Sequence, residues 1–402
     1  MKKVVVLLAL VVPVLLLMFL SVPCYADGVI KIGSFNPLTG PAATWGDWTD
    51  KAVDLGFDQW NAKGGVTVNG QKYRFEMIHY DDKLTGEEAL RAANKLIFTD
   101  KVNFIVGPLV GASVLAAQTI SEPNKILMLM GAFLGPEGLK NKPYTFRVTV
   151  PPAHSGPAYW GFVKKRHPEL KSYVHIAPNN LDGKGAAQGD NDACFVLGFT
   201  YLGNEFFEAG TQDFTPMLAR ALRKNPDFLS LCGANGADCA LIIKQARELG
   251  YKGRFLHSGG FVPSQVGPIA GWQNIEGVIT SSVGTDGPAC PDAVKVAAAK
   301  WKEKYGNDEG WSIGGFLYLY ADVLVPAIEK ANSLEPEKVK TALENMDIQT
   351  ISGVAKWGGM KTYGANHQLL VPHMISEIQN KKLAVVGIEV PWDDPPPERK
   401  WD

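Results

Sequence analysis

The sequence has no excess of charge of either sign. Its 402 residues carry 40 Lys and Arg against 41 Asp and Glu, which gives a net charge of −1. Proteins that bind nucleic acid or anionic membranes through a charged surface usually carry a basic excess. The balance therefore disfavours both kinds of partner, and we expect no nucleic-acid binding.

Cysteine and histidine are scarce. The chain has five cysteines and seven histidines, and it contains no C-x-x-C and no His/Cys group with metal-ligand spacing. Structural zinc sites require such closely spaced ligands. We therefore expect no metal site.

The stretch FNPLTGPAATWG at residues 35–46 lies between an expected strand and an expected helix. Glycine-rich turns at this place often hold a phosphate. Here no Gly-Lys-Ser/Thr follows, so no lysine reaches a terminal phosphate and no hydroxyl is placed for Mg²⁺. The pair Asp81-Asp82 follows another expected strand and is interpreted as a turn or a helix cap. We therefore expect no nucleotide, no cofactor and no enzyme activity.

The first residues have the pattern of a secretory signal peptide. Lys2 and Lys3 precede an apolar run at residues 4–20, and Cys24-Tyr25-Ala26 fits a small-x-Ala cleavage site. We predict a signal peptide at residues 1–26 and export to the periplasm. Two alternatives remain: a retained membrane anchor, which Pro13 disfavours, and a lipoprotein attached through Cys24, which the preceding Pro23 disfavours.

Cleavage would leave Cys194, Cys232, Cys239 and Cys290. Cys232 and Cys239 are placed at the end of an expected strand and the start of the next helix, so they could meet in a disulfide, which export permits. Four buried thiols are an equally good interpretation.

Short apolar runs alternate with helical patterns along most of the chain, which predicts parallel sheets covered by helices. The pattern forms two series that join near residues 148–153. We therefore predict an α/β fold of two Rossmann-like lobes with a ligand cleft between them. Lobe one is expected at residues 28–148 plus 278–353 and lobe two at residues 149–277 plus 354–390. A Pro-rich tail at residues 391–402 is expected to run loose over the surface.

Ligands of open α/β sheets bind beyond the carboxyl ends of the strands. The loops at these ends nearly all contain glycine, which lets the backbone approach a ligand closely. Trp45 and Phe133 would supply flat apolar walls, although ordinary packing explains either aromatic ring equally well. Ser113, Asp182 and Asn235 would supply polar groups.

Five segments together carry a resemblance to a known family: IKIGSFNPLTGPAATWG, WNAKGGVTVNGQKYRFEMIHYDD, VNFIVGPLVGASVLAAQTISEPNKILMLMGA, GTQDFTPMLARALRKNPDFLSLCG and IIKQARELGYKGRF. The chain resembles the periplasmic substrate-binding proteins of branched-chain amino acid ABC transporters, the leucine/isoleucine/valine-binding type with the type I fold. The resemblance implies a three-stranded hinge, closure of the cleft on a ligand, and docking to an ABC transporter permease in the inner membrane.

The resemblance also implies a set of ligand-binding positions. Serines are usual in the first-lobe loop, where this chain keeps only Ser113, and a threonine is usual where Phe133 stands. The acidic residue that would pair with a ligand ammonium falls near residues 259–260, where there is no carboxylate. From the strand-end loops and the resemblance together, the expected ligand-binding positions are Trp45, Gly111, Ser113, Ala132, Phe133, Asp182, Asn235 and Phe261.

These departures leave two possibilities for the ligand, because an unpaired buried ammonium is costly. Either Asp182 takes the ammonium, or the ligand has none. Phe133 favours an apolar or aromatic ligand, so we expect a hydrophobic amino acid or a related aromatic or aliphatic carboxylate. Two other functions remain as alternatives: a sensing receptor domain of the same fold, and an extracytoplasmic α/β enzyme.

Overall fold

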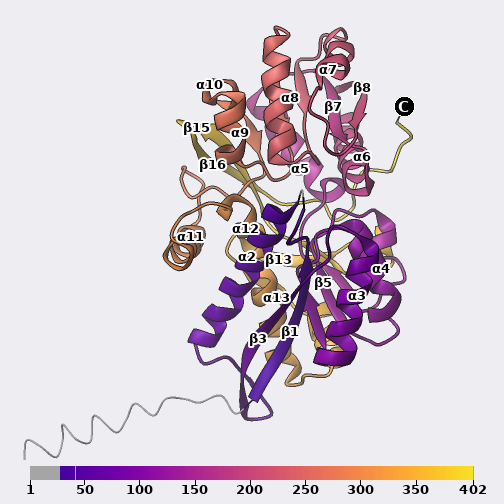
Figure 1. Cartoon of the computed structure of the whole chain (residues 1–402), viewed down its shortest axis with the longest axis vertical. Helices are drawn as coiled ribbons and strands as arrows, with labels where there is room; N and C mark the ends of the chain where they lie inside the picture. Colours follow the sequence, from indigo (N-terminus) through magenta and orange to yellow (C-terminus); the bar gives the residue numbers. More distant parts are fainter. Residues whose placement is uncertain (1–27, 41, 402) are drawn as a thin grey trace, which may run out of the picture.

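The computed structural model describes residues 28–40 and 42–401. The expected signal peptide at residues 1–26, with Cys24, lies outside the described residues. The described chain forms two α/β lobes, each built on its own sheet and stacked along the long axis of the molecule (Figure 1). The predicted fold class is confirmed.

Lobe one contains a nine-stranded sheet in the order β12-β13-β14-β6-β5-β4-β1-β3-β2, parallel from β14 to β3 and antiparallel at its edges. Its strands are β1 (Gly28–Asn36), β2 (Val66–Val68), β3 (Gln71–Asp81), β4 (Phe104–Val106), β5 (Leu127–Met130), β6 (Thr145–Arg147), β12 (Ile348–Thr350), β13 (Gly353–Gly358) and β14 (Gln368–Leu370). Its helices are α2 (Ala43–Ala62), α3 (Gly86–Asn94), the π-helical turn η1 (Lys95–Asp100), α4 (Gly111–Ser121), the 3₁₀ turn η2 (Pro136–Gly138), α11 (Asp292–Tyr305), α12 (Trp311–Leu317), α13 (Leu319–Ala331), α14 (Pro336–Glu344) and α15 (Met360–Tyr363).

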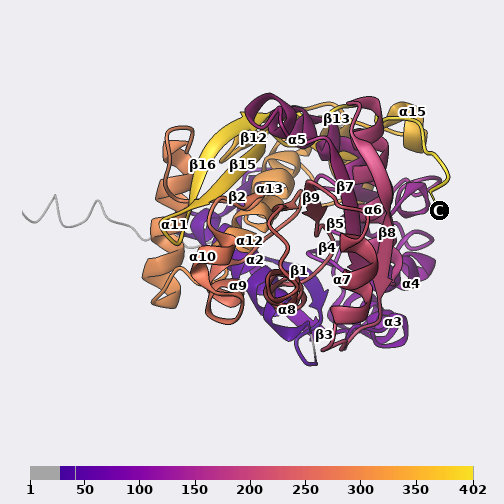
Figure 2. The same ribbon diagram turned by 90° about the horizontal axis from the view of Figure 1, so that it is seen from above.

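Lobe two contains a seven-stranded sheet in the order β16-β15-β11-β10-β9-β7-β8. Its strands are β7 (Ser172–Pro178), β8 (Thr200–Phe207), β9 (Phe228–Ser230), β10 (Arg254–His257), β11 (Ile279–Thr280), β15 (His373–Gln379) and β16 (Lys382–Glu389). Its helices are α5 (Pro152–Arg166), α6 (Leu181–Val196), α7 (Thr215–Leu222), α8 (Gly236–Glu248), α9 (Pro263–Ala270) and α10 (Trp272–Ile275). Figure 2, which looks from above, shows α8 in front of the sheet strands.

The central strands are short and apolar because helices cover both faces of each sheet. Every residue of β4 and of β5 is buried. The stretch Trp311–Ala331 is long and apolar enough to cross a membrane, but 78% of it is buried inside the structure. It forms α12 and α13, whose apolar residues belong to the core of lobe one.

Two of the expected lobe boundaries are wrong. Strand β11 pairs with β10 and β15 in the sheet of lobe two, although the sequence pattern places residues 278–353 in lobe one. Strands β13 and β14 join the sheet of lobe one through the parallel pair of β14 with β6, although the pattern places residues 354–390 in lobe two. Strand pairing between segments far apart in the sequence decides both assignments, and no local pattern reports it.

Three segments cross between the lobes, in agreement with the hinge that the resemblance implied. Residues 148–151 connect β6 to α5, residues 281–291 connect β11 to α11, and residues 371–372 connect β14 to β15. The tail at residues 391–401 is not loose, because its residues form hydrogen bonds with both lobes.

Candidate functional site

The candidate site lies where strand-end loops of the two lobes approach each other, which we call the interlobe boundary. On lobe one these loops follow β1, β4 and β5, and on lobe two they follow β7, β9 and β10. Both sets come from the carboxyl ends of parallel strands, the position at which open α/β sheets place ligands.

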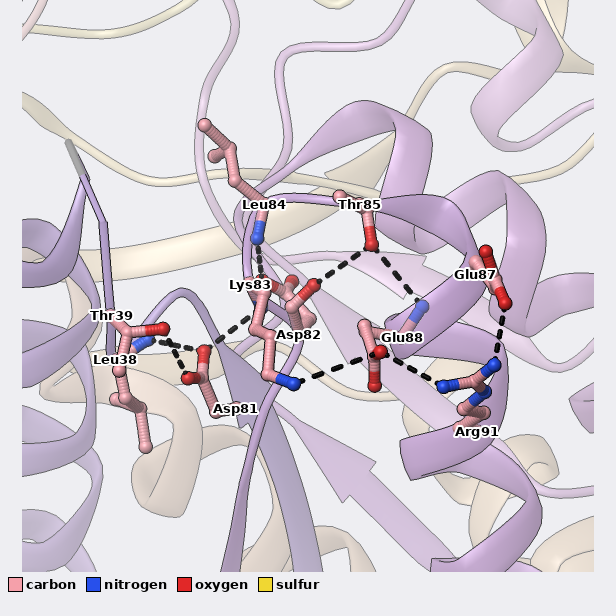
Figure 3. Close-up of polar contacts among 10 residues, drawn as sticks. All are labelled: Leu38, Thr39, Asp81, Asp82, Lys83, Leu84, Thr85, Glu87, Glu88 and Arg91. Atoms are coloured by element: carbon pink, nitrogen blue, oxygen red, sulfur yellow. Dashed lines mark hydrogen bonds and ion pairs between the residues drawn. The ribbon is translucent and has the colours of Figure 1, made fainter.

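Asp81 fixes the loop that begins at residue 37. Its Oδ1 accepts hydrogen bonds from the backbone N–H of Leu38 (2.9 Å) and Lys83 (2.8 Å), and its Oδ2 accepts one from the Thr39 hydroxyl (2.6 Å) (Figure 3). Burial raises the pKa of Asp81, but these hydrogen bonds outweigh it and hold the pKa below its usual value. The carboxylate thus ties the loop before α2 to the end of β3.

Asp82 completes a turn into helix α3. Its Oδ1 accepts from Leu84 N (2.9 Å), and the Thr85 hydroxyl then caps α3 by accepting from Glu88 N (3.2 Å) (Figure 3). The Asp81-Asp82 pair is therefore a turn and a helix start, as predicted, and its two carboxylates hold backbone.

Trp45 lies in the first turn of α2 and reaches lobe two. The ring is half-buried against the core of lobe one. A Cβ built at Gly260 would lie 3.5 Å from Cη2 of Trp45 and only 2.4 Å from Cδ1 of Ile313. Glycine at position 260 therefore permits the loop after β10 to approach α2 and α12 closely.

Asp182 crosses the boundary in the other direction. It lies in the first turn of α6 on lobe two, and its Oδ2 accepts a hydrogen bond of 3.3 Å from Gly111 N, the first residue of α4 on lobe one. Its Oδ1 is buried without a hydrogen-bond partner. Burial raises the pKa of Asp182 above its usual value, although the nearby backbone N–H groups of Gly111 and Phe133 oppose this shift.

Phe133 lies beside this contact. A Cβ at Gly185, in α6, would meet the Phe133 carbonyl oxygen at 2.8 Å, so the loop after β5 touches lobe two through its backbone. The Phe133 side chain is half-buried, while the preceding Ala132 is buried. Of the predicted ligand positions, the structure brings Gly111, Phe133 and Asp182 together across the boundary, with Trp45 at the Gly260 contact.

Arg147 binds the backbone of the loop that contains Phe133. This side chain is fully buried at the end of β6, and it donates to the carbonyl oxygens of Ala132 (3.5 Å) and Leu134. It also donates to Gln368 Oε1 (2.6 Å) and to the Tyr363 hydroxyl (2.8 Å). Sequence patterns missed this residue, although an arginine inside an apolar strand was an available signal.

Three predicted ligand positions contribute to the structure of their own lobes. Two of them are buried within their own lobes, and the third caps a helix. Ser113 is fully buried, and its hydroxyl lies beside the Asp82 carboxyl. Phe261 is 2% exposed and belongs to the core of lobe two, with its N–H bonded to Ser282 Oγ (2.6 Å). Asn235 is exposed and caps α8 by accepting from Asp238 N (3.0 Å).

Of the two interpretations of the cysteines, a Cys232–Cys239 disulfide and buried thiols, the structure shows buried thiols. Both thiols are free and buried, as are those of Cys194 and Cys290. The Cys239 thiol points to the Ala234 carbonyl oxygen (3.7 Å), whereas the Cys232 sulfur lies 3.2 Å from a Cβ built at Gly259. The two sulfur atoms therefore have different neighbours.

One further sequence pattern lies outside the predicted positions. Residues 310–314, GWSIG, match the G-x-S-x-G pattern of hydrolase nucleophiles, which requires a strand, a sharp turn and a helix. Here Gly310 follows a turn, and Ser312 is the second residue of α12. The strand that would expose the serine at a sheet edge is absent from this part of the structure, so the pattern does not indicate a nucleophile.

A charged cluster holds α2, the helix that carries Trp45, against β3. His79 places Nε2 2.8 Å from Asp54 Oδ1 and Nδ1 3.1 Å from Asp50 Oδ2. Burial lowers the pKa of His79, but the two carboxylates outweigh it and raise the pKa to about 10. The imidazolium is therefore charged at neutral pH.

This cluster predicts a pH-dependent stability. Because the pKa of His79 is higher in the folded protein than the value of about 6.5 in the unfolded chain, protonation of His79 stabilises the folded protein. This stabilisation is fully present below pH 6.5 and disappears as the pH rises toward about 10. We expect His79→Gln to lower the free energy of unfolding by about 2 kcal/mol at pH 6, with the difference shrinking by pH 10. Denaturant titrations at several pH values measure this, and a difference that is constant with pH would contradict it.

Comparisons with known proteins agree with this geometry. A family model described as periplasmic binding protein matches residues 29–382. The leucine-, isoleucine-, valine-, threonine- and alanine-binding protein of Pseudomonas aeruginosa is 27% identical over 340 residues, covering 83% of this chain and 87% of that protein. The chain is 25% identical to a leucine-binding protein of Thermotoga maritima, with a TM-score of 0.73 and coverage of 90% and 98% of the two chains. A solute-binding protein of an R. palustris ABC transporter, solved with benzoate, shares the fold at 16% identity, with a TM-score of 0.74 and coverage of 93% and 99%.

Proposed function

The chain belongs to the periplasmic binding protein family, and from this premise we propose that it captures one small organic solute between its lobes and delivers it to the permease of an ABC importer. It is exported and non-enzymatic, and its mechanism is closure of the lobes about the hinge. The ligand favours the closed form through contacts that it makes with both lobes at once.

The observation that carries this proposal is the approach of strand-end loops from both lobes. The contact of Asp182 with Gly111 and the close passage of Gly185 past Phe133 join the two lobes at the carboxyl ends of their sheets. A solute held there contacts both lobes. Trp45 and Phe133 supply aromatic surface, Asp182 supplies the polar contact, and Ser113, Asn235 and Phe261 support these loops from within their own lobes.

The ligand we propose is a hydrophobic amino acid or a related aromatic or aliphatic carboxylate. The aromatic side chains at the boundary favour an apolar body. The Pseudomonas relative is named for five amino acids, and the R. palustris protein was solved with benzoate. Both classes support a small ligand with an apolar body and a charged end.

Mass spectrometry of what co-purifies with the protein tests this function directly. We expect one small solute, released intact by heat denaturation, and calorimetric binding of leucine, phenylalanine or 4-hydroxybenzoate. Chemical conversion of the bound compound by the protein would contradict a transport role. Binding of none of these compounds, with no co-purified solute, would contradict the proposed ligand class.

Trp45 gives a prediction about affinity. We expect Trp45→Ala to weaken binding of the solute by about tenfold, because an aromatic contact of this kind contributes about 1.4 kcal/mol. Trp45→Phe retains a flat ring and should recover most of the affinity. Phe98→Ala removes an aromatic side chain that is 50% exposed on η1 of lobe one and serves as the control. Equal affinity of Trp45→Ala and the parent protein would assign Trp45 to packing alone.

A further inference from the structure

We infer that residues 391–401 form a strap that fastens lobe one to lobe two outside the hinge and opposes opening of the lobes. The strap leaves the last strand of lobe two, bonds to lobe one, and returns to lobe two along α6 (Figures 1 and 2). The inference rests on the proposed function only in giving lobe motion a role, since the contacts themselves are part of the fold.

The strap first passes over the hinge. Trp392 N donates to the His154 carbonyl oxygen (2.9 Å), and the Trp392 carbonyl oxygen accepts from His154 Nδ1 (2.7 Å). His154 lies in the first turn of α5, directly after the crossing at residues 148–151. Its Nε2 lies 2.8 Å from the hydroxyl of Tyr363, a residue of lobe one. Because Nδ1 donates to a carbonyl and burial lowers the His154 pKa to about 4, Nε2 accepts from the tyrosine.

The next two residues hold lobe one. Asp393 Oδ1 accepts from Gly359 N (2.7 Å), directly after β13. A Cβ at Gly358 would lie 2.2 Å from the same oxygen, so glycine at this position makes room for the carboxylate. Asp394 pairs with Lys361 of α15, but both side chains are more than half exposed, so this ion pair contributes little.

The last residues of the strap bind lobe two through the buried carboxylate of Asp192. Asp192, on α6, is 3% exposed, and its Oδ1 accepts from Arg399 N (3.2 Å) and from Trp401 Nε1 (2.9 Å). The guanidinium of Arg399 lies 3.7 Å from the centre of the Phe195 ring, and the Trp401 ring centre lies 4.7 Å from that of Tyr201. The strap therefore supplies two of the donors of the Asp192 carboxylate, and Gln188 Nε2 supplies a third (2.7 Å).

The segment between the two anchors is stiff. Pro395, Pro396 and Pro397 are consecutive, and such a run favours the extended polyproline conformation, with a rise of about 3.1 Å per residue. The five steps from residue 394 to residue 399 then span at most about 16 Å. A hinge rotation that separates α6 from the end of β13 beyond this span must break one of the anchors.

The closing experiment measures the interlobe distance in the ligand-free protein, so its result does not depend on which solute binds. Nitroxide labels at Glu87→Cys on α3 and Lys244→Cys on α8, both exposed, report this distance by pulsed electron double resonance. The four native thiols of the described chain are buried, and the unsubstituted protein serves as the labelling control.

Three variants release the strap without altering either lobe. Asp393→Ala/Asp394→Ala frees the lobe-one end, Arg399→Ala/Trp401→Ala weakens the lobe-two end by removing the indole bond to Asp192 and the contacts with Phe195 and Tyr201, and the quadruple variant combines both changes. We expect each double variant to raise the ratio of open to closed protein by about fivefold, the change that a contact of about 1 kcal/mol makes. The quadruple variant should open no further than Asp393→Ala/Asp394→Ala, because loss of the bond to Gly359 alone already separates the strap from lobe one.

Trp392→Ala is the matched control, since its indole is 44% exposed and its hydrogen bonds to His154 come from backbone atoms. It should leave the distance distribution unchanged. Unchanged distributions in both double variants would overturn the strap. Effects that simply add in the quadruple variant would also overturn it, because they indicate two independent local contacts.

Discussion

Replacing Arg147 with methionine should lower the free energy of unfolding by about 3 kcal/mol, the largest loss that we expect from a single substitution. Methionine fills a similar apolar volume but donates no hydrogen bonds. The carbonyl oxygens of Ala132 and Leu134 and the Gln368 amide oxygen would then lose a buried donor. Each buried acceptor left without a donor costs about 1–3 kcal/mol, partly offset because a desolvated charge is removed as well.

The Arg147 charge is unusual because its polar partners are neutral. Burial lowers the pKa of Arg147, and the nearby Tyr363 and Glu137 only partly compensate. Arg147→Lys keeps the charge but offers three donors in place of five, so we expect an intermediate loss. Arg220→Met is the matched control, since this arginine is 54% exposed and pairs with Glu205 at the surface. Calorimetric unfolding measures all three variants, and an Arg147→Met protein as stable as the control would contradict the prediction.

We expect Arg147→Met also to loosen the loop around Phe133 at the interlobe boundary. Arg147 holds the loop on both sides of Phe133 through the carbonyl oxygens of residues 132 and 134. Freeing that loop should increase hydrogen exchange at residues 131–135 more than elsewhere in lobe one, because local opening follows the loss of buried bonds. Uniform exchange across lobe one would indicate that Arg147 stabilises the lobe without positioning this loop.

Replacing Asp182 with asparagine should shift the ligand-free protein toward the closed form by about tenfold at pH 7. In the structure, where α6 and α4 meet, Asp182 Oδ1 is buried without a hydrogen-bond partner, and the bond of Oδ2 to Gly111 N is long at 3.3 Å. Closure therefore desolvates a charge that the backbone only partly compensates. An asparagine side chain keeps the acceptor for Gly111 N and carries no charge.

We also expect the population of the closed form to depend on pH. Burial between the lobes raises the pKa of Asp182 above its usual value, so we expect the approach of the lobes to take up a proton. The wild-type closed form should become more populated as the pH falls from 7 toward the acid range, whereas Asp182→Asn should show no such trend. The label pair on α3 and α8 measures both proteins. A wild-type distribution that does not change with pH, equal to that of Asp182→Asn, would contradict the prediction.

Glu137→Gln provides a control for electrostatics near Asp182. Its carboxylate also raises the Asp182 pKa, yet Glu137 is exposed and bonds to Gly135 N (3.1 Å) within its own loop. We expect only a small shift toward closure from this variant, because exposed charges are screened by solvent. A shift as large as that of Asp182→Asn would mean that net charge, and not the desolvated carboxylate, controls closure.

The sequence by itself determined the features that depend on neighbouring residues. Alternating apolar runs predicted two α/β lobes, because buried parallel strands and amphipathic helices have different periods along the chain. The position of Asp81-Asp82 after a strand predicted a turn or a helix cap; in the structure the pair forms a turn, and Thr85 caps α3. The loop at residues 35–46 lacks the lysine and the hydroxyl of a phosphate loop, and this local chemistry alone argues against a nucleotide there.

The tertiary structure alone decided which distant segments meet and which way side chains point. Strands β11, β13 and β14 took their lobes from long-range pairing, and the strap took its course from bonds between residues 34–238 positions apart. Ser113 was expected in a strand-end loop but lies in the first turn of α4, and Phe261 lies in the expected loop after β10; both are buried. The contact of Asp182 with Gly111 joins residues 71 positions apart on different lobes. Local periodicity constrains the backbone of one element, whereas contacts between elements depend on how all of them pack together.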